Sequence, residues 1–141
     1  MDKLYTAKAT ATGGRNGNVK SSDGILDLEL RMPKAMGGAN DNYTNPEQLF
    51  AAGYAACFDS ALNMIAKANN AAAGTATVTA EVSIGKNGKG GFGLAVVLNV
   101  NVAGVELDVA KDLVAKAHEV CPYSNAIRGN VEVELVVTNE V

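Results

Sequence analysis

Two cysteines, Cys57 and Cys121, are the only thiols in this 141-residue chain, and they raise the first question about its chemistry. Two cysteines cannot build a disulfide scaffold, and a core of this size does not need one. The pair is therefore either two inert buried thiols or a redox couple. His118 is the only histidine and no Cys-x-x-Cys motif occurs, so the sequence predicts no structural metal site.

Cys57 lies among small and apolar residues of a predicted helix. A thiolate in such surroundings is costly, and its pKa rises unless a cation lies beside it. A reactive Cys57 therefore requires a positive partner, whereas an inert Cys57 is a small buried hydrophobe. Cys121 lies far along the chain, at a helix end beside Pro122, where a second thiol can swing into place. A disulfide requires the two Cα atoms within about 7 Å.

Arg15 is the only charged residue of the glycine-rich turn Gly13–Gly17. Flanking glycines let a loop fold inward, and a guanidinium stays charged, so Arg15 can bind a carboxylate and a thiolate together. The alternative is a solvated surface arginine. Glu47 has its simplest role as a complement to a helix dipole. Because Glu47 and Cys57 would lie roughly 15 Å apart along a helix axis, a shared site needs Arg15 as a bridge or a residue from another subunit.

Strand and helix patterns occur in runs along the chain. Alternation predicts an antiparallel three-stranded meander, then a hairpin, and last a single strand. The expected strands are Leu4–Ala11, Asn18–Ser21, Ile25–Leu30, Thr75–Ile84, Phe92–Val102 and Val131–Val137. The order βββ-α-ββ-α-β favours an α+β fold, in a single domain over residues 1–141.

The first predicted helix has a strong start signal. Asn45 is a good N-cap, Pro46 suits the first helical position, and Gln48 completes a capping-box pattern. We expect this helix to run to about Asn69. Its first half, Leu49–Phe58, is apolar on every face, which predicts burial on every side. A chain of this length has few elements to surround it, so we infer that a second subunit supplies the missing wall.

The second predicted helix precedes the last strand. Asp108 is its expected cap, and it must end near Cys121 because Pro122 disfavours helical geometry in the residue before it. His118 lies in its last turn, where an imidazolium would suit the helix dipole, so His118 is interpreted as structural.

Composition narrows the possible partners. The net charge is −3 and no run of Lys or Arg occurs, which argues against a nucleic-acid or anionic-membrane partner. The longest apolar run is Leu49–Phe58, and a membrane span needs roughly 18 apolar residues, so no membrane segment is expected. The start, Met1–Tyr5, lacks the apolar stretch of a signal peptide, which predicts the cytoplasm.

Three segments carry a family resemblance: Gly13–Gly17, Asn45–Phe58 and Ala117–Asn125. Together, in this order, they resemble the organic hydroperoxide resistance (Ohr) proteins of the Ohr/OsmC family over essentially the whole chain. The Cys-Pro-Tyr-Ser-Asn stretch favours the Ohr branch over OsmC-type peroxidases, which stay an alternative. Ile127 departs from the pattern, because the family usually has threonine there.

The resemblance implies an antioxidant thiol peroxidase of the oxidative stress response, acting on organic hydroperoxides without haem, flavin or metal. It implies an intertwined homodimer of antiparallel sheets around a buried central helix. Cys57 is then the peroxidatic cysteine and Cys121 the resolving one, joined in a redox-active disulfide, while Arg15 stabilises the thiolate and Glu47 orients Arg15. Lipoylated proteins or dihydrolipoamide, rather than thioredoxin, are the implied reductants.

The substrate preference is a hypothesis. An apolar pocket of Leu49, Phe50, Phe58 and Met64 would favour alkyl or fatty-acid hydroperoxides over hydrogen peroxide, because burying an apolar tail stabilises by about 0.8 kcal/mol per CH₂. Two other classes stay open: a redox sensor or binding protein that uses the same thiols, and a structural small-molecule carrier with inert thiols.

Overall fold

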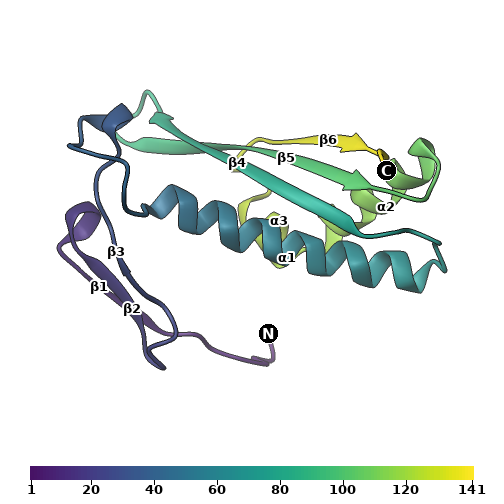
Figure 1. The fold of residues 1–141 in the computed structure, drawn as a ribbon, viewed down its shortest axis with the longest axis horizontal. Helices are drawn as coiled ribbons and strands as arrows, with labels where there is room; N and C mark the ends of the chain where they lie inside the picture. Colours follow the sequence, from purple (N-terminus) through teal and green to yellow (C-terminus); the bar gives the residue numbers. More distant parts are fainter. The chain divides into compact units, whose positions relative to one another are not determined.

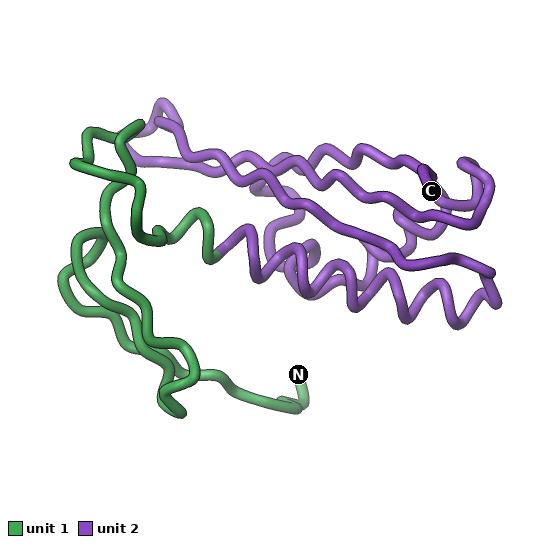
Figure 2. Tube along the Cα trace, in the orientation of Figure 1, with its two compact units in different colours: residues 1–49 green, residues 50–141 purple.

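The computed structural model describes residues 1–141, and its elements follow the predicted α+β order with one addition (Figure 1). The strands are β1 (Ala9–Thr12), β2 (Asn18–Ser21), β3 (Asp27–Glu29), β4 (Ala76–Lys86), β5 (Phe92–Val102) and β6 (Val133–Thr138). The helices are α1 (Pro46–Ala68), α2 (Leu107–Val120) and the added α3 (Pro122–Ile127). The chain groups into two compact units, residues Met1–Leu49 and Phe50–Val141 (Figure 2), and each is described by itself. The prediction of a single domain stays a prediction.

The first unit carries the predicted antiparallel meander. Strands β1, β2 and β3 pair in that order, and β3 is shorter than the expected Ile25–Leu30. The shortening has a local cause, because the Asp23 carboxylate accepts the Ile25 N–H and the Ser21 hydroxyl accepts the Leu26 N–H. Such side-chain bonds hold the turn open and compete with a strand ladder.

Helix α1 begins at the predicted residue. The Asn45 Oδ1 atom accepts the Gln48 N–H at 2.9 Å, which confirms Asn45 as the N-cap. The capping box is incomplete, because the Gln48 side chain accepts a hydrogen bond from the Thr44 hydroxyl rather than reaching back to the Asn45 N–H. Length and composition alone would allow α1 to cross a membrane, a criterion that core helices of soluble proteins also meet.

The second sheet is mixed, and this corrects the expectation of purely antiparallel sheets. Strands β4 and β5 form an antiparallel hairpin, but β6 lies parallel to β5. The reason is the connection, since α2 and α3 together return the chain across the sheet before β6 starts. Helix α3 was not predicted: Pro122 ends α2 and also serves as a first helical residue, where its missing N–H costs nothing. The cap of α2 is Glu106, and Asp108 lies in its first turn.

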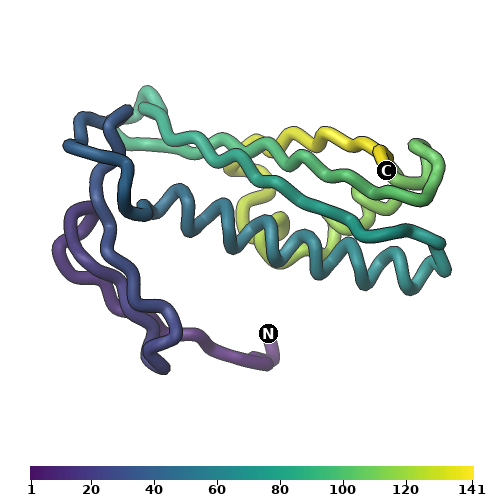
Figure 3. The backbone as a smooth tube through the Cα atoms, in the orientation of Figure 1, coloured from purple at the N-terminus to yellow at the C-terminus, as the bar shows by residue number.

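The core of the second unit lies between the sheet and its helices, which cover one face of the sheet (Figure 3). Alternate residues of β5 point into it, as period-two geometry requires. Its fully buried members include Tyr54, Phe58, Leu62, Val96, Leu98, Val100, Val102, Leu113 and Val114. Within the single chain the burial of α1 is one-sided, because Ala52, Ala56 and Met64 are exposed. The expected second subunit that would cover the other side stays a prediction.

The N-cap of α1 gives a stability test. Replacing Asn45 by Ala leaves the Gln48 N–H without its acceptor, so we expect a loss of about 1 kcal/mol in the free energy of unfolding. Urea denaturation measures it. Asn63→Ala is the matched control, because Asn63 is exposed within the same helix and caps nothing. Equal effects of the two changes would contradict the capping assignment.

Candidate active site

The two thiols come together in the second unit. Cys57 lies on α1 and Cys121 lies between α2 and α3, and their Sγ atoms are 3.9 Å apart. Both are free, Cys121 is fully buried and Cys57 is half-buried. A disulfide has an S–S distance of about 2.05 Å. The sulfurs are therefore adjacent but unbonded, and a small approach would join them.

Cys121 occupies its place because a proline follows it. The backbone at Cys121 is extended, with φ −61° and ψ 124°, so α2 stops and α3 starts in a new direction. The Cys121 N–H still donates to the Ala117 carbonyl at 2.9 Å, and the Cys121 carbonyl accepts the Asn125 N–H at 2.9 Å. The second thiol is thus attached to the end of one helix and the start of the next.

Tyr123 packs across α1 one turn before Cys57. Its ring contacts the rings of Tyr54 and Phe50, with centroids 5.7 and 6.0 Å away. Its hydroxyl occupies space that only glycine leaves open, since a Cβ on Gly53 would lie 2.6 Å from that oxygen. The Tyr123 main-chain N–H also faces the Cys57 sulfur and lowers the Cys57 pKa. Sequence reasoning missed Tyr123 as a site residue, because no local pattern indicates that an aromatic residue so far along the chain packs against Gly53.

A buried chain of hydrogen bonds, here called the Tyr54–Ser124–His118 relay, lies beside the thiols. The Ser124 hydroxyl is 2.7 Å from the Tyr54 hydroxyl and 2.8 Å from His118 Nδ1. Tyr54 and Ser124 are both fully buried. Burial, followed by the charge of Arg128, lowers the His118 pKa and favours the neutral ring over the imidazolium that would suit the helix dipole.

The second unit by itself does not activate Cys57. Burial raises the pKa of the Cys57 thiol, and the neighbouring Cys121 raises it further. The Tyr123 N–H acts in the opposite direction because it stabilises the thiolate, but burial outweighs it. A Cys57 nucleophile at neutral pH therefore needs a cation that the second unit does not provide.

The first unit holds the other two predicted residues together. Arg15 donates from Nη1 and Nη2 to both carboxylate oxygens of Glu47, at 2.7 and 2.6 Å. This hydrogen-bonded pair lowers the pKa of Glu47. Arg15 stands on a short 3-10 turn whose entry needs glycine, because Gly13 and Gly14 have φ of 79° and 58°. Two guanidinium hydrogens are used, which leaves three N–H donors for another acceptor.

The four residues predicted to line an apolar pocket differ in their surroundings. Phe58 is fully buried between the rings of Tyr54 and His118, so it belongs to the core. Phe50 is partly buried beside Tyr54 and Tyr123. Met64 is 58% exposed, and Leu49 is half-buried in the first unit. The substrate-binding role of these residues stays a prediction.

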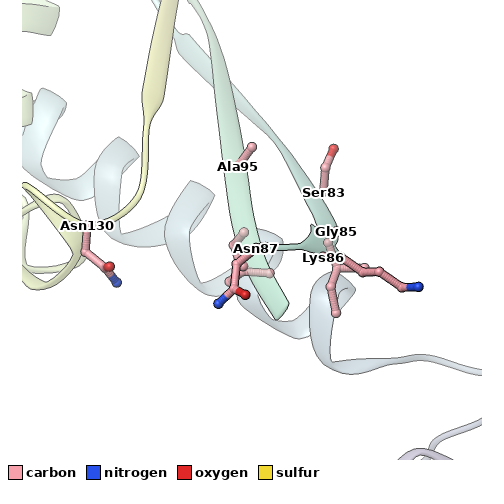
Figure 4. A pocket seen from close by; sticks show the side chains of 9 residues that line it. Ser83, Gly85, Lys86, Asn87, Ala95 and Asn130 are labelled. Atoms are coloured by element: carbon pink, nitrogen blue, oxygen red, sulfur yellow. The ribbon is translucent and has the colours of Figure 1, made fainter. Parts of the chain in front are cut away.

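A hollow of about 420 Å³ lies elsewhere, at the β4–β5 hairpin. Lys86 and Asn87 of the hairpin and Asn130 of the segment before β6 line it (Figure 4). Neither cysteine lines this hollow, so it is separate from the thiols. Along residues 1–141, no group of three His, Cys, Asp or Glu side chains is arranged to hold a metal ion.

Comparison with known proteins identifies the family of the chain. The model of the family described as "OsmC-like protein" matches residues 38–136. The organic hydroperoxide resistance protein of Xanthomonas axonopodis pv. citri (strain 306) is 50% identical over 135 residues, covering 95% of this chain and 94% of that protein. These values, over nearly the full length of both proteins, establish common ancestry.

Two crystal structures extend the comparison. An organic hydroperoxide resistance protein from Elizabethkingia anophelis with bound thiocyanate is 61% identical, with a TM-score of 0.96, covering 99% of this chain and 100% of that one. One from Vibrio cholerae O1 biovar eltor, described with captopril in one of the active sites, is 50% identical with a TM-score of 0.93, covering 99% and 96%. The chain belongs to the OsmC-like family, in its organic hydroperoxide resistance group.

The contact of Tyr123 with Gly53 gives a test of how the site is packed. We expect Gly53→Ala to destabilise the protein by about 1–3 kcal/mol, because the new Cβ displaces the Tyr123 ring. In a Tyr123→Ala background the same change should stabilise by up to about 1 kcal/mol, the ordinary helix preference for alanine. Urea denaturation of the four proteins measures this reversal of sign.

The matched control is Gly85→Ala, because a Cβ on Gly85 meets nothing within 4 Å. It should give the same small effect in both backgrounds. Stabilisation by Gly53→Ala with Tyr123 present would contradict the packing assignment.

Proposed function

We propose that this protein is a cysteine-based peroxidase that reduces organic hydroperoxides to alcohols. The observation that carries the proposal is the 3.9 Å approach of two free sulfurs in a chain whose relatives are named organic hydroperoxide resistance proteins. The role in the cell is removal of organic hydroperoxides in the cytoplasm.

The order of events follows from exposure. Cys57 is half-buried and Cys121 is fully buried, so Cys57 is the thiol that a hydroperoxide can reach. The Cys57 thiolate attacks the distal peroxide oxygen, the O–O bond breaks, and the alkoxide takes a proton and leaves as alcohol. Cys57 is then a sulfenic acid. The Cys121 sulfur attacks it, the S–O bond breaks, water leaves, and a Cys57–Cys121 disulfide remains.

Arg15 is the proposed cation for the Cys57 thiolate, and Glu47 orients it. Two observations support this. The second unit raises the Cys57 pKa, which makes a cation necessary. Arg15 is held by both oxygens of Glu47 on a glycine-supported turn, with N–H donors remaining. An arginine suits the task because it cannot lose its charge.

We also propose a homodimer with two sites. In the first unit only Leu30 is buried, so this unit lacks a core of its own. Helix α1 exposes the small side chains of Ala52 and Ala56, a surface that a second backbone can approach closely. The Vibrio cholerae relative is described with more than one active site, which fits a repeated site.

The side chains around Cys57 decide which substrate and which reductant can reach its sulfur. The partly exposed rings of Phe50 and Tyr123 flank Gly53, one turn from the thiol, and offer an apolar approach for an alkyl or fatty-acid chain. The disulfide is reduced by thiol exchange with an external dithiol, for which we propose a lipoylated protein or dihydrolipoamide.

Turnover with two cysteine variants tests the function. The wild-type protein should consume tert-butyl hydroperoxide continuously with dihydrolipoamide, faster than it consumes hydrogen peroxide and faster than with thioredoxin. Cys57→Ser should abolish consumption. Cys121→Ser should complete one turnover and then over-oxidise Cys57, detected by mass spectrometry as a sulfinic acid.

Other results would select other functions. Thiol oxidation at stoichiometric peroxide without turnover by any dithiol would make the protein a redox sensor. An unchanged number of titratable thiols after a peroxide pulse would make it a carrier with inert thiols.

Arg15→Gln tests the cation. Without the guanidinium the Cys57 pKa should rise, and each unit of rise lowers the thiolate fraction at neutral pH about tenfold. We therefore expect the oxidation rate at pH 7 to fall about tenfold or more and to recover toward pH 9, measured by stopped-flow fluorescence. Arg31→Gln is the matched control: Arg31 is an arginine of the same unit that stacks on Tyr43 at 4.7 Å. An equal loss in both variants would remove Arg15 from the mechanism.

A further inference from the structure

The Tyr54–Ser124–His118 relay has no part in the chemistry described so far. Its three side chains come from three helices: Tyr54 from α1, His118 from α2 and Ser124 from α3. Two hydrogen bonds of 2.7 and 2.8 Å meet at the Ser124 hydroxyl, which has no exposure to solvent. A serine hydroxyl buried in a hydrophobic core costs free energy unless it is hydrogen-bonded, so these two hydrogen bonds are needed to keep Ser124 in the core.

The direction of the relay follows from counting hydrogens. Tyr54 and Ser124 each have one O–H hydrogen, and both side chains are fully buried. If Tyr54 donates to Ser124 and Ser124 donates to His118 Nδ1, both buried hydrogens are used. In the opposite direction the Tyr54 hydrogen has no acceptor. The first arrangement is therefore favoured, and His118 acts as the terminal acceptor through an unprotonated Nδ1.

The relay ends on the segment that carries the second thiol. Ser124 lies one turn after Cys121, and His118 lies one turn before it. The same segment is closed by Arg128, whose guanidinium donates to the His118 carbonyl and to the Asn125 side chain. The position of Cys121 relative to Cys57 is thus determined by where Ser124 is held against α1 and α2.

We propose that His118 is a positioning residue for the second thiol: through its hydrogen bond to Ser124, and the bond from Tyr54 to Ser124, it holds Cys121 at the distance from which the two sulfurs join. This inference rests on the proposed function. His118 touches neither sulfur. Its effect falls on one step, in which the Cys121 thiol attacks the Cys57 sulfenic acid, the S–S bond forms, the S–O bond breaks, and the thiol proton leaves with the hydroxide as water.

The step is sensitive to position because the distance to be closed is short. The sulfurs must move from 3.9 Å to about 2.05 Å, so a shift of α3 by a fraction of that difference changes how often they meet. Peroxide attack at Cys57 does not use Cys121 and should not depend on the relay. The proposal therefore predicts separate effects on the two steps.

Protonation of His118 should release the relay. An imidazolium donates from Nδ1 to the Ser124 oxygen, so it no longer accepts the Ser124 hydrogen, and one buried hydroxyl hydrogen, that of Ser124 or of Tyr54, is left unpaired. The groups that face the ring are Ser124 of α3, Arg128 at the end of α3, Phe58 from α1, and Glu119 from its own helix. The neutral ring, favoured in the folded protein, is present above the ordinary histidine pKa of 6.5 and is lost as pH falls below it through the lowered value.

A single-turnover experiment separates the steps. Reduced protein is mixed with one equivalent of tert-butyl hydroperoxide, and quenched samples are assayed for sulfenic acid with dimedone and for disulfide by mass spectrometry. His118→Leu should slow disulfide formation about tenfold, the effect of one buried hydrogen bond, while formation of the sulfenic acid stays within twofold of wild type. His118→Asn should restore disulfide formation at neutral pH, because its Oδ1 atom can accept the Ser124 hydrogen near the place of Nδ1.

The control is Lys116→Leu, the same replacement on the exposed side of α2, which should change neither step. The wild-type protein supplies a test that needs no folded His118→Leu variant. Since thiol chemistry itself depends on pH, the measured quantity is the ratio of the wild-type rate of disulfide formation to that of His118→Asn. This ratio should fall as the pH is lowered from 6.5 through the lowered His118 pKa.

The outcomes distinguish the two proposals. A ratio that does not change with pH, or a His118→Leu protein that slows both steps equally or neither, would overturn the role of His118 while leaving the peroxidase intact. Absence of sulfenic acid in the wild-type protein would overturn the proposed function itself.

Discussion

The packing of the Cys121 segment across α1 is the constraint on which the site depends. Cys57 and Cys121 belong to different helices, and they come within 3.9 Å only because Pro122 turns the chain and α3 lies against α1. Gly53 makes room for the Tyr123 hydroxyl, and Ser124 is tied to Tyr54. Neighbouring residues of one short helix thus provide a ring, a hydroxyl and a main-chain N–H around the thiols.

Burial makes this spacing precise but works against reactivity. A dry environment fixes side chains and favours the protonated thiol, so the same packing that aligns the sulfurs raises the Cys57 pKa. A charge must come from elsewhere. The pair of Arg15 and Glu47 has the chemistry for it, since Glu47 holds a guanidinium that remains charged. The proposed mechanism therefore assigns the thiols to the second unit and the cation to the first.

Much of the fold follows from local patterns. The meander, the hairpin, the start of α1 and the end of α2 were predicted within a few residues, because glycine turns, alternation, the Asn45 cap and Pro122 act on their own neighbours. The predictions were wrong where contacts between residues distant in sequence decide the structure. The parallel pairing of β6 depends on the path of α2 and α3, and α3 itself is too short to show a period.

The amino-acid sequence by itself determined the family of the protein and indicated its candidate reactive residues, from two thiols, one arginine among glycines and three motifs. Only the tertiary structure decided that Arg15 meets Glu47, that the sulfurs nearly touch, and that Tyr54, Ser124 and His118 form one buried chain. The physical reason is the separation along the sequence of the residues that interact. Caps and turns are read from residues a few positions apart, whereas hydrogen bonds between residues 70 positions apart exist only after three helices have packed.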